Sequence, residues 1–120
     1  MKRKTDMTNT FPDVSFVRGS RVQPTFPETG LERRVGAHND RLFLAEHRME
    51  KGWVGSAHSH PHDQVVYVVS GHLRIVADGK TFEIQRGDSF VARGGVLHQA
   101  TALESSIVVD VFTPCREDYL

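Results

Sequence analysis

The stretch QVVYVVSGHLRIVADGKTFEI, residues 64–84, indicates a β-fold. Its first two runs, 64–70 and 72–77, are rich in β-branched residues, which favour the pleated strand, and Gly71 separates them. The pair Asp78-Gly79 is a strong signal for a two-residue hairpin turn, and residues 80–84 return from that turn. The stretch therefore predicts consecutive antiparallel strands.

Short runs of the same character lie on both sides of this stretch, separated by turn signals such as Asn39-Asp40, Gly87-Asp88 and Gly94-Gly95. The expected strands are 31–35, 41–49, 64–70, 72–77, 80–84, 89–92, 97–102 and 106–113. No segment shows a helical period of ten or more residues. Many short strands joined by Gly-rich turns are typical of an all-β sandwich or barrel.

Length, charge and cysteine content exclude several classes of function. A chain of 120 residues suits one domain, and its 15 basic and 15 acidic residues cancel, which argues against nucleic acid or a membrane surface as partner. Cys115 is the only cysteine, so no internal disulfide forms, and we expect a bystander thiol. The N-terminus lacks an apolar signal-peptide core, and no apolar run could span a bilayer, so we expect a cytoplasmic protein.

The first 30 residues differ from the rest. Residues 1–13 are polar and predict a loose arm, and residues 18–30 contain Gly19, Pro24 and Pro27, which predict a loop. We therefore divide the chain into an N-terminal arm and loop, 1–30, and a barrel, 31–120. The arm could add a strand to a partner's exposed sheet edge.

Residues 52–64 (GWVGSAHSHPHDQ) predict a metal site. In an extended chain His58 and His60 point to the same face, and a break at Pro61 lets Gln64 turn its side-chain oxygen to the same point. His98 begins another strand and supplies a third imidazole. Such a set leaves coordination positions open, as catalytic sites do. The remaining histidines default to structural or surface roles: His38, His47, His62 (a solvated loop residue) and His72.

The spacing resembles the two motifs of the cupin superfamily. The first motif reads Gly52, His58, His60, Gln64 and Gly71, with Gln64 at the position where cupins carry Glu. The second motif reads Gly87, Arg93, Gly95, His98 and Ala102, in which Arg93 replaces a Pro and Ala102 replaces an Asn. The resemblance covers residues 31–120 and implies a double-stranded β-helix, the jelly-roll barrel.

The neutral fourth ligand affects the chemistry. Three His and one Gln leave the full charge on one divalent ion, which makes it a stronger Lewis acid but more weakly bound. Ni, Zn, Mn, Co and Fe all suit imidazole and amide ligands, so the sequence does not identify the metal. Polarising a substrate hydroxyl or carbonyl fits this set at least as well as oxygen activation.

The last expected strand places a carboxylate among apolar residues. Asp110 and Phe112 share one face, and if that face points inward Asp110 can act as general base. Arg116, near the cavity mouth, can grip a substrate carboxylate with its planar fork. The structural alternatives are a hydrogen bond from Asp110 to a backbone turn, and a surface ion pair of Arg116 with Glu117 or Asp118.

The stretch 58–64 together with the ending 110–120 resembles the small pectin-degradation cupins. Those proteins convert 4,5-unsaturated monouronates to linear ketonised forms. The resemblance implies proton transfer by Asp110 and a sugar-acid pocket shaped by Phe112 and Arg116, with Arg93 as a departure that affects specificity. It also implies a homodimer and a small carboxylated substrate. The alternatives are a metal-dependent dioxygenase and a non-catalytic small-molecule-binding cupin.

Overall fold

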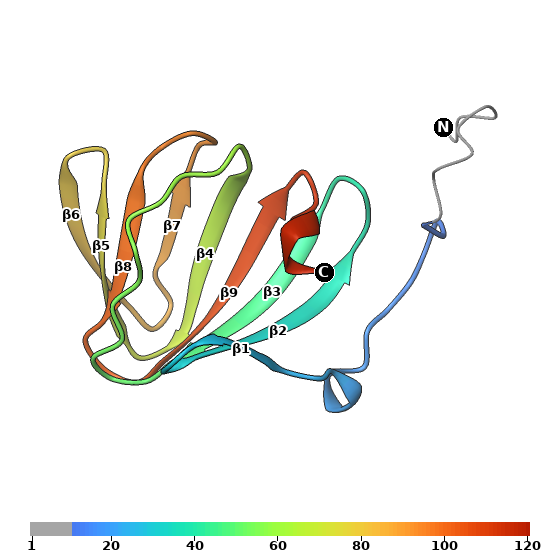
Figure 1. Cartoon of the computed structure of the whole chain (residues 1–120), viewed down its shortest axis with the longest axis horizontal. Helices are drawn as coiled ribbons and strands as arrows, with labels where there is room; N and C mark the ends of the chain where they lie inside the picture. Colours follow the sequence, from blue (N-terminus) through green and yellow to red (C-terminus); the bar gives the residue numbers. More distant parts are fainter. Residues whose placement is uncertain (1–10) are drawn as a thin grey trace.

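The computed structural model of the chain describes residues 11–120, which form two antiparallel β-sheets facing each other (Figure 1). The described elements are η1 (Gly19–Arg21), β1 (Thr25–Glu28), β2 (Leu31–His38), β3 (Phe43–Met49), β4 (Asp63–Ser70), β5 (His72–Ala77), β6 (Lys80–Gln85), β7 (Ser89–Ala92), β8 (His98–Ala102), β9 (Ser106–Thr113) and η2 (Glu117–Tyr119). The six-stranded sheet has the order β1-β2-β3-β9-β4-β7, and the three-stranded sheet has the order β6-β5-β8. Neighbours so distant in sequence are typical of a jelly roll, which confirms the predicted fold class.

The segment leading into the histidine motif extends the smaller sheet. It runs beside β8, where Val54 pairs with Thr101 and His58 pairs with His98 as isolated antiparallel bridges. Figure 1 shows this segment as the long green trace that crosses the sheet before it enters β4. The histidine motif therefore lies on the same side of the molecule as the start of β8.

Alternation along the strands determines which side chains lie between the sheets. The β4 residues Val66 and Val68 are buried while Val65, Tyr67 and Val69 are exposed. The main core consists of Leu31, Met49, Val66, Val68, Leu73, Ile75, Ala77, Ile84, Ala102 and Val108. Burying a side chain of Val or Leu size contributes about 1.5–3 kcal/mol, so this layer holds the two sheets together.

Three expected strands have the observed bounds, at 72–77, 89–92 and 106–113. The largest extension is in β2, which continues to His38 past an irregularity in its pairing with β3 after Val35. The expected loop at 18–30 is wrong, because Thr25–Glu28 forms β1 and pairs with β2. Pro27 has no N–H to donate, and a strand at the sheet edge tolerates it. The part of the expected arm at residues 1–10 lies outside the described residues.

Candidate metal centre

Three histidines from two distant stretches meet at one end of the space between the sheets. The candidate ligand atoms of His58, His60 and His98 all lie within 4.8 Å of one another. The bridge between His58 and His98 explains this closeness, because each backbone N–H donates to the other's carbonyl, at 3.0 and 2.9 Å. His60 joins them from two residues further along the chain, on the same face as His58.

Each of the three rings is oriented by a backbone carbonyl. The Nδ1 atoms of His58, His60 and His98 lie 3.0, 3.0 and 2.9 Å from carbonyl oxygens. A carbonyl only accepts, so Nδ1 carries the proton and the Nε2 lone pair is free in each neutral ring. This is the arrangement that orients imidazoles toward a metal ion.

Burial favours the neutral form of these rings. Burial is the main cause that lowers the pKa of both His60 and His98 below the ordinary value. The Nε2 atom of His98 is buried and lacks a hydrogen-bond partner among the described residues. An unpaired buried acceptor is costly, and a bound divalent cation would satisfy it.

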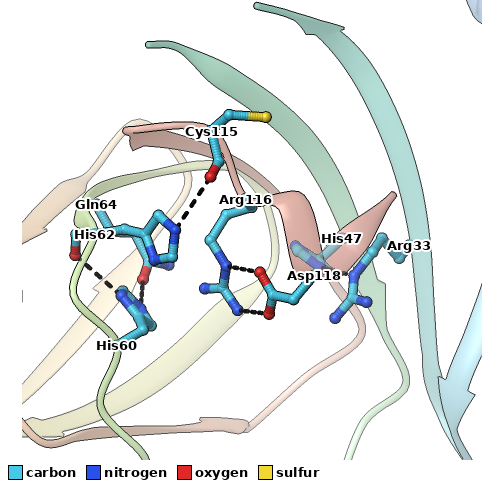
Figure 2. Close-up of polar contacts among 8 residues, drawn as sticks. All are labelled: Arg33, His47, His60, His62, Gln64, Cys115, Arg116 and Asp118. Atoms are coloured by element: carbon cyan, nitrogen blue, oxygen red, sulfur yellow. Dashed lines mark hydrogen bonds and ion pairs between the residues drawn. The ribbon is translucent and has the colours of Figure 1, made fainter. Parts of the chain in front are cut away.

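Gln64 connects this centre to Asp110. Its side-chain nitrogen donates to Asp110 Oδ1 at 2.8 Å. This hydrogen bond orients the oxygen Oε1 toward His60 Nε2, 2.9 Å away, and Figure 2 shows the contact between Gln64 and His60. In the neutral His60 ring those two atoms are both acceptors, so a cation between them fits the donor set. A Glu at this position would have no N–H for Asp110. The amide of Gln64 therefore holds Asp110 by a hydrogen bond that a carboxylate at this position would not provide.

A cavity of about 340 Å³ opens beside the three histidines. Its polar wall includes Arg33, His47, His58, Gln64, His98, Asp110, Arg116 and Tyr119. Its apolar wall includes Leu31, Met49, Trp53, Val66, Leu73, Ile75, Phe90 and Val108. This mixed lining suits a small polar molecule that is held at one end and shielded from water at the other.

The face of β9 that carries Asp110 and Phe112 points inward. Asp110 is 4% exposed and Phe112 is 1% exposed, and both line the cavity. The Phe112 ring packs edge-on against His60, with the ring centroids 5.8 Å apart. Asp110 is therefore a buried carboxylate beside the three histidines, and its partners are side chains, not a backbone turn.

Arg116 is buried at the cavity wall and pairs with a carboxylate on η2. Its Nε and Nη2 atoms donate to the two oxygens of Asp118, at 3.0 and 2.8 Å (Figure 2). The hydrogen bond from Arg116 lowers the pKa of Asp118. The third nitrogen, Nη1, is buried without a partner among the described residues. Arg116 thus forms an ion pair with Asp118, one of the two partners named in the structural alternative, but its own side chain is buried and keeps one nitrogen free to donate to another acceptor.

Two expectations for single residues are not met. Arg93 is exposed and does not line the cavity, because β7 ends at Ala92 and a tight turn follows. His62 is half-buried, not solvated, and its Nε2 lies 3.2 Å from the carbonyl oxygen of Cys115 (Figure 2). The return of the chain after β9 covers His62, which local sequence does not indicate.

The cavity-wall residues that sequence reasoning missed include Arg33, His47 and Tyr119. His47 Nδ1 lies 2.5 Å from Asp110 Oδ2, and Arg33 Nε donates to His47 Nε2 at 3.0 Å. The ring of Tyr119 lies under the guanidinium of Arg33, 3.5 Å from its central carbon. The signal for His47 was available, because alternation in β3 puts it on the inward face with Phe43 and Met49.

The fold and the histidine centre define a cupin, and comparison with known proteins agrees. The model of the Cupin domain family matches residues 45–112, more than half of the chain, so this chain belongs to the cupin family. It is 32% identical over 93 residues to the pectin degradation protein KdgF of Dickeya dadantii (strain 3937), covering 76% of this chain and 84% of that protein.

Two solved structures are also similar. The structure of KdgF from Halomonas sp. superposes with a TM-score of 0.85 at 36% identity, covering 89% of this chain and 99% of that one. An RmlC-like cupin from Shewanella frigidimarina NCIMB 400 superposes with a TM-score of 0.84 at 33% identity, covering 88% and 95%. Among residues 11–120, no helix is long and apolar enough to cross a membrane.

Proposed function

We propose that this chain is a metal-dependent enzyme that converts a 4,5-unsaturated monouronate to its linear ketonised form. The observation that carries the proposal is a buried carboxylate, Asp110, joined through Gln64 to a cluster of three histidines beside one cavity. The similarity to two proteins called KdgF, one described as a pectin degradation protein, supports this substrate class. We also propose a cytoplasmic location, since the single cysteine requires no oxidising compartment.

The residues that would hold the metal are His58, His60, Gln64 and His98. A divalent ion bound by them would supply Lewis acidity toward a substrate hydroxyl or carbonyl. Asp110 would transfer the proton. Its place in the cavity wall supports this role, and so do the lone pairs that its two oxygens keep beyond the hydrogen bonds they accept. Ring opening and ketonisation move protons without a redox change, which suits a single carboxylate base.

Arg116 is the proposed partner of the substrate's carboxylate. It is 6% exposed, it lines the cavity, and its Nη1 has no partner among the described residues. A guanidinium nitrogen in this position offers a charge-assisted hydrogen bond to an incoming carboxylate. Phe112, which lies against the Arg116 guanidinium at 4.9 Å, would limit the space available to the sugar acid.

The test is an assay with 4,5-unsaturated galacturonate, following the loss of absorbance of its conjugated double bond. Protein loaded separately with Ni, Zn, Mn, Co or Fe should turn over with at least one metal. Asp110→Asn should lower kcat by about 100-fold or more, as expected for loss of a general base. The matched control is Asp78→Asn, which changes an exposed carboxylate in the hairpin turn and should keep wild-type activity.

Four outcomes would contradict the proposal. Turnover with none of the metals would remove it, and so would an active preparation in which Asp110→Asn is as fast as wild type. Oxygen uptake by the iron-loaded protein with a phenolic acid, without activity on the uronate, would favour a dioxygenase. Tight binding of the uronate without turnover would favour a binding protein.

A further inference from the structure

We propose that Arg33 and His47 are positioning residues that hold the side chain of Asp110 in one orientation toward the cavity. The functional part of this inference rests on the proposed role of Asp110 in proton transfer. Its structural part, a defined protonation state of His47, can be tested independently of any activity. Neither residue belongs to the histidine centre or to the Arg116 site.

A continuous hydrogen-bonded row crosses four neighbouring strands of the large sheet. Arg33 on β2 donates to His47 on β3 at 3.0 Å, and His47 Nδ1 lies 2.5 Å from Asp110 Oδ2 on β9. Gln64 on β4 completes the row by donating to Asp110 Oδ1 at 2.8 Å. The register explains the row, because Arg33 lies directly opposite His47, and Asp110 lies diagonally opposite both His47 and Gln64.

The chemistry of Arg33 determines where the protons of the row lie. A guanidinium does not lose its proton in proteins, so Arg33 Nε can only donate and His47 Nε2 must accept. The neutral ring of His47 then carries its proton on Nδ1 and donates it to Asp110 Oδ2. Asp110 thus receives a hydrogen bond on each oxygen, which fixes the orientation of its side chain and leaves its other lone pairs for a substrate proton.

Burial and an aromatic contact keep the row in place. His47 is 8% exposed and Asp110 is 4% exposed, so water does not compete strongly for these hydrogen bonds. The Tyr119 ring stacks on the Arg33 guanidinium at 3.5 Å and lies 4.0 Å from the central carbon of Arg116. Figure 2 shows Arg33, His47 and the Arg116–Asp118 pair side by side at this end of the cavity. The same tyrosine therefore contacts the arginine that orients the base and the arginine proposed to hold the substrate.

The first experiment reads the protonation state of His47 by long-range ¹H–¹⁵N NMR, with and without Zn²⁺. Wild type should show a neutral ring with its proton on Nδ1. Arg33→Met removes the donor and keeps much of the bulk, so the ¹⁵N signal of His47 Nε2 should move to that of an acceptor without a hydrogen bond, while Nδ1 keeps its proton. Arg33→Lys keeps a donor and should preserve the wild-type pattern. An Nε2-protonated His47 in wild type, or an unchanged pattern in Arg33→Met, would overturn the proposal.

The second experiment separates positioning from bulk. His47→Asn places an amide N–H where Nδ1 lies, whereas His47→Leu fills the space and donates nothing. We expect His47→Leu to lower kcat by roughly 10- to 100-fold with little change in KM, and His47→Asn to retain most of kcat. Equal losses in the two variants, or a change confined to KM, would overturn the positioning role. Should wild type be inactive, the proposed function fails while the NMR result still decides the state of the row.

Discussion

At the scale of single residues, the side chain of Gln64 presents an acceptor to His60 and a donor to Asp110, a combination that an amide provides and a carboxylate does not. Its oxygen lies 2.9 Å from His60 Nε2, and its nitrogen donates to Asp110 at 2.8 Å. A carboxylate at this position would offer a charged metal ligand but would face Asp110 with a second acceptor. The neutral side chain of Gln64 thus keeps the candidate base hydrogen-bonded, and it would leave the full charge on a bound metal ion.

Gln64→Glu is therefore expected to destabilise the metal-free protein at pH 8. Loss of a hydrogen bond to a charged group costs about 1.5–3 kcal/mol of unfolding free energy. The loss should shrink at pH 5, because the introduced carboxyl group, once protonated, can donate to Asp110 again. Urea denaturation in the presence of a chelator measures both values. Gln23→Glu, at an exposed position, is the control, and a Gln64→Glu protein as stable as wild type at pH 8 would contradict the argument.

Tyr119 supplies a prediction about alkaline pH. Burial raises its pKa above the ordinary value of 10.0, outweighing Arg116 and Arg33, which lower it. The unfolded chain therefore loses this proton first as the pH rises, so the stability that Tyr119 contributes is present below pH 10 and is lost above it. Tyr67→Phe leaves Tyr119 as the only tyrosine, and its tyrosinate absorbance should reach half-titration above pH 10. A midpoint below 10 in the folded protein would refute this.

At the scale of elements, the turn between β7 and β8 is hydrogen-bonded to the segment that carries His60 and Asp63. Gly94 N donates to Asp63 Oδ1 at 2.7 Å, and Gly95 N donates to the carbonyl of His60 at 2.8 Å. A Cβ on Gly94 would overlap the carbonyl oxygen of Pro61. The two glycines, which the sequence marks as a turn, allow close contact between two backbones.

Gly94→Ala should push this turn away from the histidine segment and loosen the histidine cluster. Overpacking of this kind costs typically about 1–3 kcal/mol in unfolding free energy. We expect the affinity for Zn²⁺, measured by calorimetry, to fall at least about tenfold, because the ligands lose their mutual positions. Gly19→Ala is the control, since a Cβ there meets open space. Unchanged affinity in Gly94→Ala would show that contact between this turn and the histidine segment does not affect Zn²⁺ binding.

At the scale of the whole molecule, the large sheet exposes an apolar row on its outer face. Leu44, Val111, Val65 and Val91 lie opposite one another on β3, β9, β4 and β7, and each is at least 36% exposed. Apolar side chains that gather across four strands are typical of a surface that associates with another protein. This row is the best candidate for the contact surface of the expected homodimer.

The dimer itself stays a prediction, and light scattering measures it directly. Wild type should have the mass of two chains, and Val65→Lys with Val91→Lys should give a monomer because charges would be buried in the contact. Val76→Lys is the matched control, because Val76 has similar exposure, 41% against 43% for Val65, and lies on the other sheet. A monomeric wild type would reject the dimer.

The sequence alone determined what depends on local periodicity. Alternation of apolar residues predicted most strands, the spacing of His58 and His60 predicted a shared face, and the apolar surroundings of Asp110 indicated its burial. These features follow from the two-residue repeat of a strand, which any short window of sequence contains.

The tertiary structure decided which strands lie opposite one another and in what register. Only this register brings His98 opposite His58 and places Arg33 beside His47. It also places Asp110 and Gln64 where they continue the hydrogen-bonded row that begins at Arg33. It also turns Arg93 to solvent and covers His62 with the C-terminal segment. Contacts between strands that are distant in sequence depend on how the two sheets close around one core, and no local pattern encodes that closure.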